Sequence, residues 1–342
     1  MNPIKTALVG FGNVGEKTHA PLIQACPYLE LCAVVERSQQ KSKVKYPHVE
    51  VYRSLEALLE ADAADLIVVV TPNDLHFEQA KLCLEKGKHV LVDKPVTISS
   101  EEAIILKRIS EENERVLSVF QNRRLDGDFK TVQKLIDEEK LGKLVHFESH
   151  FDRFRPQISE NWREKDNLGN GITYDLGTHL IDQAVCLFGM PKWVKAEIKV
   201  QRENAIADDF FDIILGYDTP YVRLTASVLS NAPMPKFLLQ GYKGSYIKYG
   251  LDVQEKALKA GIAPEGDDWG VEDPSGWGKI YFADNTKSIQ TERGDYRDFY
   301  LNLAKAIMGE EKLMVKIDEA INVLKIIESA FESSKNGQKI DL

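Results

Sequence analysis

The chain has 342 residues, 43% hydrophobic and 28% charged, with 44 basic and 53 acidic residues and a formal net charge of −9. The length fits about two globular domains, and the acidic balance argues against a nucleic acid or an anionic membrane as partner, because no overall positive field attracts either. No apolar run approaches a membrane span, the four cysteines form no C-x-x-C pair, and the first strand pattern begins too early for a signal peptide, so we expect a reduced, cytoplasmic protein.

Strand and helix patterns alternate through the first third of the chain. The stretch at 66–70 is entirely apolar, as expected for a strand that helices cover on both faces of a parallel sheet. The alternation predicts an α/β fold that begins with a doubly wound parallel sheet of the Rossmann type over residues 1–122. The expected strands are 4–9, 29–35, 66–70, 89–92 and 116–119, and the expected helices are 14–25, 55–60, 74–86 and 100–113.

The rhythm changes after residue 122. Apolar side chains now alternate so that they share one face of each strand, which is typical of an antiparallel sheet with one side exposed. We interpret residues 123–342 as a C-terminal α/β domain with an open, largely antiparallel sheet, whose last helix can pack back toward the first domain. Expected here are a helix at 129–139, strands at 143–151, 192–201, 210–217, 221–229 and 236–240, a long loop at 261–278, and two closing helices.

A glycine motif lies between the first strand and the first helix. The residues Gly10-Phe11-Gly12-Asn13-Val14-Gly15 have the spacing G-x-G-x-x-G in the strand-to-helix context that a dinucleotide-binding loop needs. The first glycine permits the tight turn, the second lets the backbone approach a pyrophosphate, and the third lets helix and strand pack closely. The helix N-terminus adds backbone donors for the phosphates. The motif predicts NAD or NADP as cofactor, against the alternative of a plain glycine turn.

The corner after the second strand bears on which of the two cofactors is used. Glu36 stands near the position where a carboxylate binds the adenosine ribose and repels a 2′-phosphate, which favours NAD. Arg37 and Ser38 follow it, and an arginine at this corner can pair with the 2′-phosphate of NADP or stack on the adenine. The sequence therefore favours NAD slightly and leaves NADP open, and an exposed charged corner is the structural alternative.

Two segments carry candidate catalytic residues. Lys94, between Asp93 and Pro95, follows a strand of the parallel sheet, and ligands bind at the carboxyl edge of such sheets. Asp175 and His179 are four residues apart and would share one face of a helix. A histidine titrates near neutral pH and suits proton transfer from an alcohol.

Each of these residues also has another interpretation. A Lys-Pro turn is often only a surface turn, and Asp175 and His179 could serve the structure of their helix. A metal site that recruits Asp182 and His150 is the competing chemistry, but no H-E-x-x-H motif or cysteine cluster supports it, so we expect no metal.

The chain resembles the Gfo/Idh/MocA oxidoreductase family along nearly its whole length, and within it the branch that contains NADP-dependent scyllo-inositol dehydrogenase. The features that match the family are the 10–15 loop, Thr71-Pro72-Asn73-Asp74-Leu75-His76, Asp93-Lys94-Pro95 and Asp175-x-Gly-x-His179. Those that suggest the branch are Gln121-Asn122-Arg123-Arg124, Phe154-Arg155-Pro156, Trp162-Arg163-Glu164, Tyr174-Asp175-Leu176-Gly177 and His179-Leu180-Ile181-Asp182-Gln183. Asp93 stands where many relatives have glutamate, and Glu36 where NADP-dependent relatives tend to have a small polar residue.

The resemblance implies a Rossmann domain, a substrate-binding C-terminal domain, and a homodimer or homotetramer formed through the C-terminal sheet. It also implies roles for residues in two groups. The cofactor groove is lined by Thr71, Pro72, Asn73, His76 and the Asp93-Lys94 pair, and Asn122, Trp162 and Arg163 approach the nicotinamide or the substrate. Arg123, Arg124, Arg153 and Arg155 are candidates for contacts with substrate hydroxyls or an anionic group, although solvation or ion pairing explains each of them equally well.

These observations lead to one mechanism. A hydride passes between the nicotinamide and a secondary alcohol of a sugar or cyclic polyol, His179 exchanges the hydroxyl proton, Lys94 hydrogen-bonds the same oxygen and stabilises its developing charge, and Asp175 orients the pair. A non-catalytic sensor of NAD(P) or sugar with the same fold is the alternative from another class. Reduction of an unrelated carbonyl or imine is a third possibility, because fold and cofactor do not fix the substrate.

Overall fold

The computed structural model describes residues 2–159, 164 and 169–342, and the chain divides into two compact units. The first unit comprises Met1–Asn122, Gln254–Trp269 and Asp295–Ile321; the second comprises Arg123–Val253, Gly270–Gly294 and Asn322–Leu342. None of the helices in the described residues is long and apolar enough to cross a membrane.

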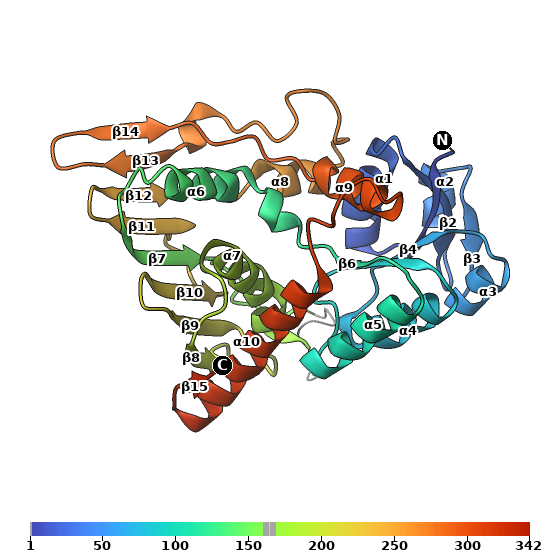
Figure 1. Cartoon of the computed structure of the whole chain (residues 1–342), viewed down its shortest axis with the longest axis horizontal. Helices are drawn as coiled ribbons and strands as arrows, with labels where there is room; N and C mark the ends of the chain where they lie inside the picture. Colours follow the sequence, from blue (N-terminus) through green and yellow to red (C-terminus); the bar gives the residue numbers. More distant parts are fainter. Residues whose placement is uncertain (1, 160–163, 165–168) are drawn as a thin grey trace. The chain divides into compact units, whose positions relative to one another are not determined.

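The first unit contains a six-stranded parallel sheet with the strand order β3-β2-β1-β4-β5-β6 (Figure 1). Its central strand β4 is buried throughout, which explains the continuous apolar run of its sequence. The carboxyl ends of parallel strands lie at one edge, so the loops that follow β1, β2, β4 and β5 share that edge. The strands are β1 (Ile4–Val9), β2 (Leu29–Val35), β3 (Glu50–Tyr52), β4 (Leu66–Val69), β5 (His89–Val92) and β6 (Leu117–Val119).

Helices connect these strands, and side-chain caps start two of them. Ser54 accepts a hydrogen bond from the backbone N–H of Ala57, and Ser99 accepts one from the backbone N–H of Glu102. Each bond gives a partner to a backbone donor at the start of a helix. The connecting helices are the π-helical turn η1 (Gly15–His19), α1 (Ala20–Ala25), α2 (Lys41–Lys45), α3 (Leu55–Glu60), the 3₁₀ turn η2 (Asn73–Leu75), α4 (His76–Glu85) and α5 (Ser100–Glu112). The later helix α9 (Arg297–Ile307) also belongs to the first unit.

The second unit is built on a nine-stranded sheet with the order β14-β13-β12-β11-β7-β10-β9-β8-β15. Only the pair of β7 and β10 is parallel among its strand pairs in the described residues. The strands are β7 (Leu144–His150), β8 (Trp193–Lys199), β9 (Phe210–Gly216), β10 (Tyr221–Ser227), β11 (Phe237–Gly241), β12 (Ser245–Lys248), β13 (Gly278–Tyr281), β14 (Thr286–Ile289) and β15 (Ile340–Asp341).

Helices cover one face of this sheet. Phe129 of α6 (Gly127–Asp137) packs against Phe237 of β11, and Phe188 of α7 (Thr178–Phe188) packs edge-on against Phe147 of β7. The end of α10 (Ile317–Asn336) lies beside β8 (Figure 1). There Ser333 accepts a hydrogen bond from the backbone N–H of Ala196. On the opposite face the side chains of β9 and β10 are half-buried or exposed, so no helix among the described residues of this unit covers them.

The structure confirms the predicted fold class, an N-terminal parallel sheet followed by a largely antiparallel one. It also adds elements that the sequence analysis did not predict, namely β3, α2, the strands β12 to β14, α8 (Val253–Lys259) and β15. The helix expected at 14–25 is divided into η1 and α1. The expected loop at 261–278 contains the short turn η6 (Pro274–Gly276) and reaches β13 at its last residue.

Candidate functional site

The glycine loop leaves β1 and enters η1, as the motif predicts. Gly10 has a φ of 101°, and a Cβ there would lie 2.7 Å from the Val70 carbonyl oxygen; a Cβ on Gly15 would collide with the Gly10 carbonyl. A Cβ on Gly12, in contrast, would meet nothing within 4 Å. The chain itself therefore requires two of the glycines, whereas the open side of Gly12 fits the close approach of a pyrophosphate.

Glu36 follows β2 and is buried, with 7% of its surface exposed. Its two carboxylate oxygens accept hydrogen bonds from the backbone N–H groups of Lys41 and Ser42, at 2.9 and 2.7 Å, and so cap the start of α2. Arg53 fixes the same loop by donating to the carbonyl oxygens of Glu36 and Gln39. Glu36 thus has a structural use that the sequence analysis did not foresee, while Arg37 beside it is exposed.

The segment after β4 is tied to the segment after β5 by His76. This histidine is completely buried, and its Nδ1 and Nε2 lie 2.7 Å from the Pro95 carbonyl oxygen and 2.9 Å from that of Thr71. Burial lowers the pKa of the imidazole, so the neutral ring donates to one carbonyl at a time. Asn73 opens η2 in the same segment.

Asp93 and Lys94 follow β5 directly, and the Lys94–Pro95 peptide bond is cis. Burial raises the pKa of the Asp93 carboxyl, but contact with His19 and the charge of Lys94 outweigh it, so this pKa lies below its usual value. The carboxylate is therefore ionised at neutral pH beside the lysine. Four loops that the sequence marked thus meet one sheet edge, which is where open α/β sheets bind ligands.

In the second unit, Asp175 lies in the π-helical turn η5 (Thr173–Gly177) and His179 in the first turn of α7. The helix that the sequence predicted is present, but its first turn is π-helical, a form that is frequent at functional sites. His179 is 6% exposed. Oδ2 of Asp175 lies 3.8 Å from Nη1 of Arg153, so the carboxylate has a cationic neighbour.

Asp208 anchors the start of η5, a role that the sequence analysis missed. Its Oδ2 accepts hydrogen bonds from the backbone N–H and the hydroxyl of Thr173, at 2.8 and 2.7 Å. Burial raises the pKa of the Asp208 carboxyl to about 6, despite the opposing effect of these hydrogen bonds. The only sequence signal was a pair of aspartates just before a strand, which by itself indicates a turn.

The predicted arginines differ in their surroundings. Arg124 makes two hydrogen bonds to Asp182, from Nε at 2.8 Å and from Nη2 at 2.6 Å. Arg123 and Arg153 place their guanidinium groups 4.7 and 4.9 Å from the ring centre of Phe151, within cation–π range. Arg155 is exposed. Asn122, half-buried, opens the 3₁₀ turn η3 (Asn122–Leu125), and Trp162 and Arg163 lie outside the described residues.

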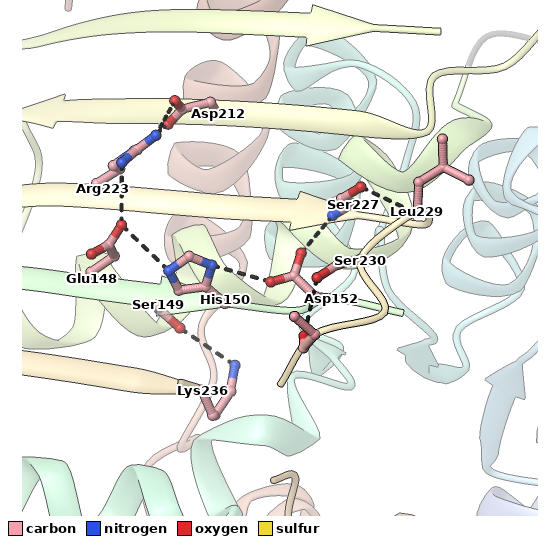
Figure 2. A network of polar contacts seen from close by, with 11 residues as sticks. Glu148, Ser149, His150, Asp152, Asp212, Arg223, Ser227, Leu229, Ser230 and Lys236 are labelled. Carbon is pink, nitrogen blue, oxygen red and sulfur yellow. Dashed lines mark hydrogen bonds and ion pairs between the residues drawn. The ribbon is translucent and has the colours of Figure 1, made fainter. Parts of the chain in front are cut away.

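A charged network occupies the sheet face that α6 and α7 do not cover (Figure 2). His150 lies between two carboxylates, with Nε2 3.4 Å from Glu148 and Nδ1 3.2 Å from Asp152. Arg223 joins Glu148 to Asp212, and Oδ1 of Asp152 accepts a hydrogen bond from the Ser227 backbone. The two residues of the alternative metal site, His150 and Asp182, are thus engaged in different contacts. Within the described ranges, no group of three or more histidine, cysteine or acidic residues is placed to hold a metal ion.

Two family models match the sequence of this chain. Residues 4–121 match the Gfo/Idh/MocA model described as an oxidoreductase family NAD-binding Rossmann fold, and residues 133–342 match the model of the C-terminal α/β domain of the same family. The chain therefore belongs to the Gfo/Idh/MocA family of oxidoreductases, as the sequence resemblance predicted.

Individual relatives match along the full length. The chain is 38% identical to scyllo-inositol 2-dehydrogenase (NADP(+)) IolW of Bacillus subtilis, over 100% of this chain and 97% of that protein. It is 40% identical to the oxidoreductase YdgJ of Escherichia coli, over 97% of both chains. Among solved structures, the oxidoreductase yvaA from Bacillus subtilis superposes with a TM-score of 0.96 at 38% identity, covering 100% of this chain and 99% of the other.

Proposed function

We propose that this oxidoreductase is an NAD(P)-dependent dehydrogenase that transfers a hydride between the nicotinamide and a secondary alcohol or ketone of an inositol-like polyol or a sugar. The observation that carries the proposal is the full-length similarity to a scyllo-inositol 2-dehydrogenase in a chain that has Lys94, Asp175 and His179. The bound nicotinamide would accept or supply the hydride. The presence of all three residues favours an enzyme over a sensor of the same fold.

The three residues have distinct roles in this proposal. His179 exchanges the hydroxyl proton of the substrate, since an imidazole titrates near neutral pH. Lys94 donates a hydrogen bond to the same oxygen and stabilises its developing negative charge. Asp175 orients the histidine, and its carboxylate lies 3.8 Å from the Arg153 guanidinium.

Separate groups of residues are proposed to bind the cofactor and the substrate. The glycine loop and the segment that contains Thr71, Pro72 and Asn73 would hold the dinucleotide. We propose that both NAD and NADP bind, because two backbone donors partly compensate the Glu36 charge and Arg37 is free to approach a 2′-phosphate. For the substrate, Arg153 and Arg155 offer guanidinium groups, whereas Arg124 supports α7 through Asp182.

We also propose that the protein is a cytoplasmic homo-oligomer that associates through the uncovered face of the nine-stranded sheet. This face combines charged side chains with half-buried or exposed apolar ones, as interfaces between protein chains do. The apolar residues of the face are Phe210, Ile214, Tyr221, Leu238, Ile247 and Tyr281. A reducing compartment suits the four free cysteines.

The test is a spectroscopic assay of nicotinamide reduction with NAD and NADP in parallel against inositols, other cyclic polyols, aldoses and sugar acids. We expect turnover with an inositol or a sugar, a loss of at least about a hundredfold in Lys94→Ala, and a similar loss in His179→Asn. Cofactor binding without turnover on any substrate would instead favour the sensor. Near wild-type turnover of His179→Asn across pH would remove the histidine from the proposed mechanism.

A further inference from the structure

His19 is a buried histidine that the proposed mechanism does not use. It is the last residue of η1, and its side chain is 0% exposed. One ring nitrogen, Nδ1, lies 2.5 Å from the phenol oxygen of Tyr300 on α9, and the other, Nε2, lies 3.6 Å from Oδ1 of Asp93. The ring of Phe120 packs on the imidazole at a centroid distance of 4.5 Å. All four residues belong to the first unit.

The hydrogen bond between Tyr300 and His19 links the phenol hydrogen to the tautomer of the imidazole. Burial raises the pKa of the Tyr300 phenol well above its usual value, so the phenol keeps its hydrogen at neutral pH. A Tyr300 phenol that donates this hydrogen to Nδ1 of His19 requires Nδ1 to carry no hydrogen itself. The ring hydrogen then lies on Nε2, which has no hydrogen-bond partner among the described residues and faces Oδ1 of Asp93 at 3.6 Å.

The carboxylate that His19 faces stands next to Lys94 in the chain. About 15% of the Asp93 side chain is exposed, so water contributes little to its solvation and the imidazole N–H takes over part of that role. On the other side of the lysine, the Pro95 carbonyl oxygen lies 2.7 Å from Nδ1 of His76. Two buried histidines thus hold the residues before and after Lys94.

We propose that His19, oriented by Tyr300, is a positioning residue that holds the Asp93 carboxylate at the end of β5 and thereby fixes the turn that presents Lys94. This proposal deepens the hydride-transfer function proposed above and rests on it for its kinetic consequence. It assigns no contact between His19 and the substrate. Its structural part concerns only residues of the first unit.

A matched pair of variants tests the role of the Nε2 hydrogen. His19→Gln keeps an N–H group at nearly the same distance from the backbone, whereas His19→Leu has a similar volume and no donor. Tyr300→Phe removes the phenol hydroxyl alone and is the milder change if His19→Leu does not fold. Tyr246→Phe is the control, because Tyr246 is a fully buried tyrosine of the second unit whose hydroxyl has no hydrogen-bond partner among the described residues.

The first readout is NMR of the protein without cofactor. In ¹⁵N-histidine spectra we expect the Nε2–H tautomer for His19 in the wild type and a mixture of tautomers in Tyr300→Phe. In ¹³C-aspartate spectra we expect the pKa of Asp93 to rise by about one unit in His19→Leu and by less in His19→Gln. The Nδ1–H tautomer in the wild type, or an Asp93 titration equal in all variants, would overturn the proposal.

The second readout is turnover with the substrate that the assay identifies. We expect kcat to fall by about ten- to a hundredfold in His19→Leu, since small displacements of a catalytic group have effects of this size, and by less than about fivefold in His19→Gln. The KM of the cofactor should change little, and Tyr246→Phe should match the wild type. Equal losses of kcat in His19→Gln and His19→Leu would overturn the positioning role and show that His19 contributes only to packing.

The two readouts separate the two proposals. If the wild type turns over no substrate but the NMR results are as expected, the proposed function fails and the positioning of Asp93 by His19 stands. If the wild type is active and the NMR spectra show no link between His19 and Asp93, the positioning role fails and the proposed function stands.

Discussion

Glu36 and Arg37 are neighbours whose side chains have opposite surroundings. The Glu36 carboxylate is buried against two backbone N–H groups, and the Arg37 side chain is exposed. We therefore expect Arg37→Ala to raise the KM for NADP by about tenfold or more, the usual effect of losing a hydrogen bond to a charged group, and to change the KM for NAD by less than about twofold. Parallel kinetics with both cofactors measure this. Arg108→Ala, an exposed arginine on α5, is the control, and equal changes for both cofactors would contradict the assignment.

Asp208 makes the stability of the second unit depend on pH. Burial raises its pKa to about 6, so the folded state holds a proton that the unfolded state has already released above about pH 4. The stability from this group is complete below about pH 4 and is lost as the pH rises to about 6. We expect Asp208→Asn to remove this loss, a difference of at most about 3 kcal/mol between the two ends of the range. Urea unfolding of both proteins from pH 4 to 7 measures it, and parallel curves would show that Asp208 titrates normally.

At the scale of elements, the glycines between β1 and η1 have different roles: one is needed for the fold, and another is proposed to serve cofactor binding. A Cβ on Gly15 collides with the Gly10 carbonyl, whereas a Cβ on Gly12 meets nothing within 4 Å. Gly15→Ala should therefore lower the free energy of unfolding by about 1–3 kcal/mol. Gly12→Ala should leave it nearly unchanged but weaken cofactor binding by at least about tenfold. Thermal unfolding without cofactor and titration with NAD and NADP distinguish the two, and a loss of stability in Gly12→Ala would contradict this division of roles.

Elements differed in how well the sequence predicted them, and the clarity of their hydrophobic pattern is the main reason. β4 was predicted from a continuous apolar run, and β8 from the alternation of apolar with polar residues. β3 and β13 are short and mix polar with apolar residues, so neither pattern is clear in them. The π-helical turns η1 and η5 were not predicted either, because each has only five residues, too few to show a change in hydrophobic spacing.

Candidate site residues could be predicted where they are neighbours in the sequence. Motifs of adjacent residues, such as the glycine loop and Asp93-Lys94, were placed by the sequence at the sheet edge where the structure has them. Contacts between distant residues were not predictable, because they depend on the folded chain. Arg124 and Asp182 are 58 residues apart, and His19 and Tyr300 are 281 apart.

At the scale of the whole molecule, the proposed association through the nine-stranded sheet leads to a test of mass. Ile214 lies on the uncovered face, paired in register with Arg223 on one side and Lys195 on the other. Ile214→Arg would place a third cation in this row, and like charges side by side are destabilising in an interface. We expect sedimentation to give a multiple of 38.7 kDa for the wild type and a single chain for the variant. Val44→Lys, at an exposed position of the first unit, should keep the wild-type mass, and a monomeric wild type would contradict the proposal.

The path of the chain through its two units limits how this protein can be recombined with a relative. The chain changes unit after residues 122, 253, 269, 294 and 321, so the first unit is assembled from three separate stretches. A chimaeric gene joined only at residue 122 would combine His19 from one parent with Tyr300 from the other. A chimaera that also takes residues 254–269 and 295–321 from the parent of the N-terminal part would keep such pairs together. These three stretches together form the smallest exchangeable block for the first unit.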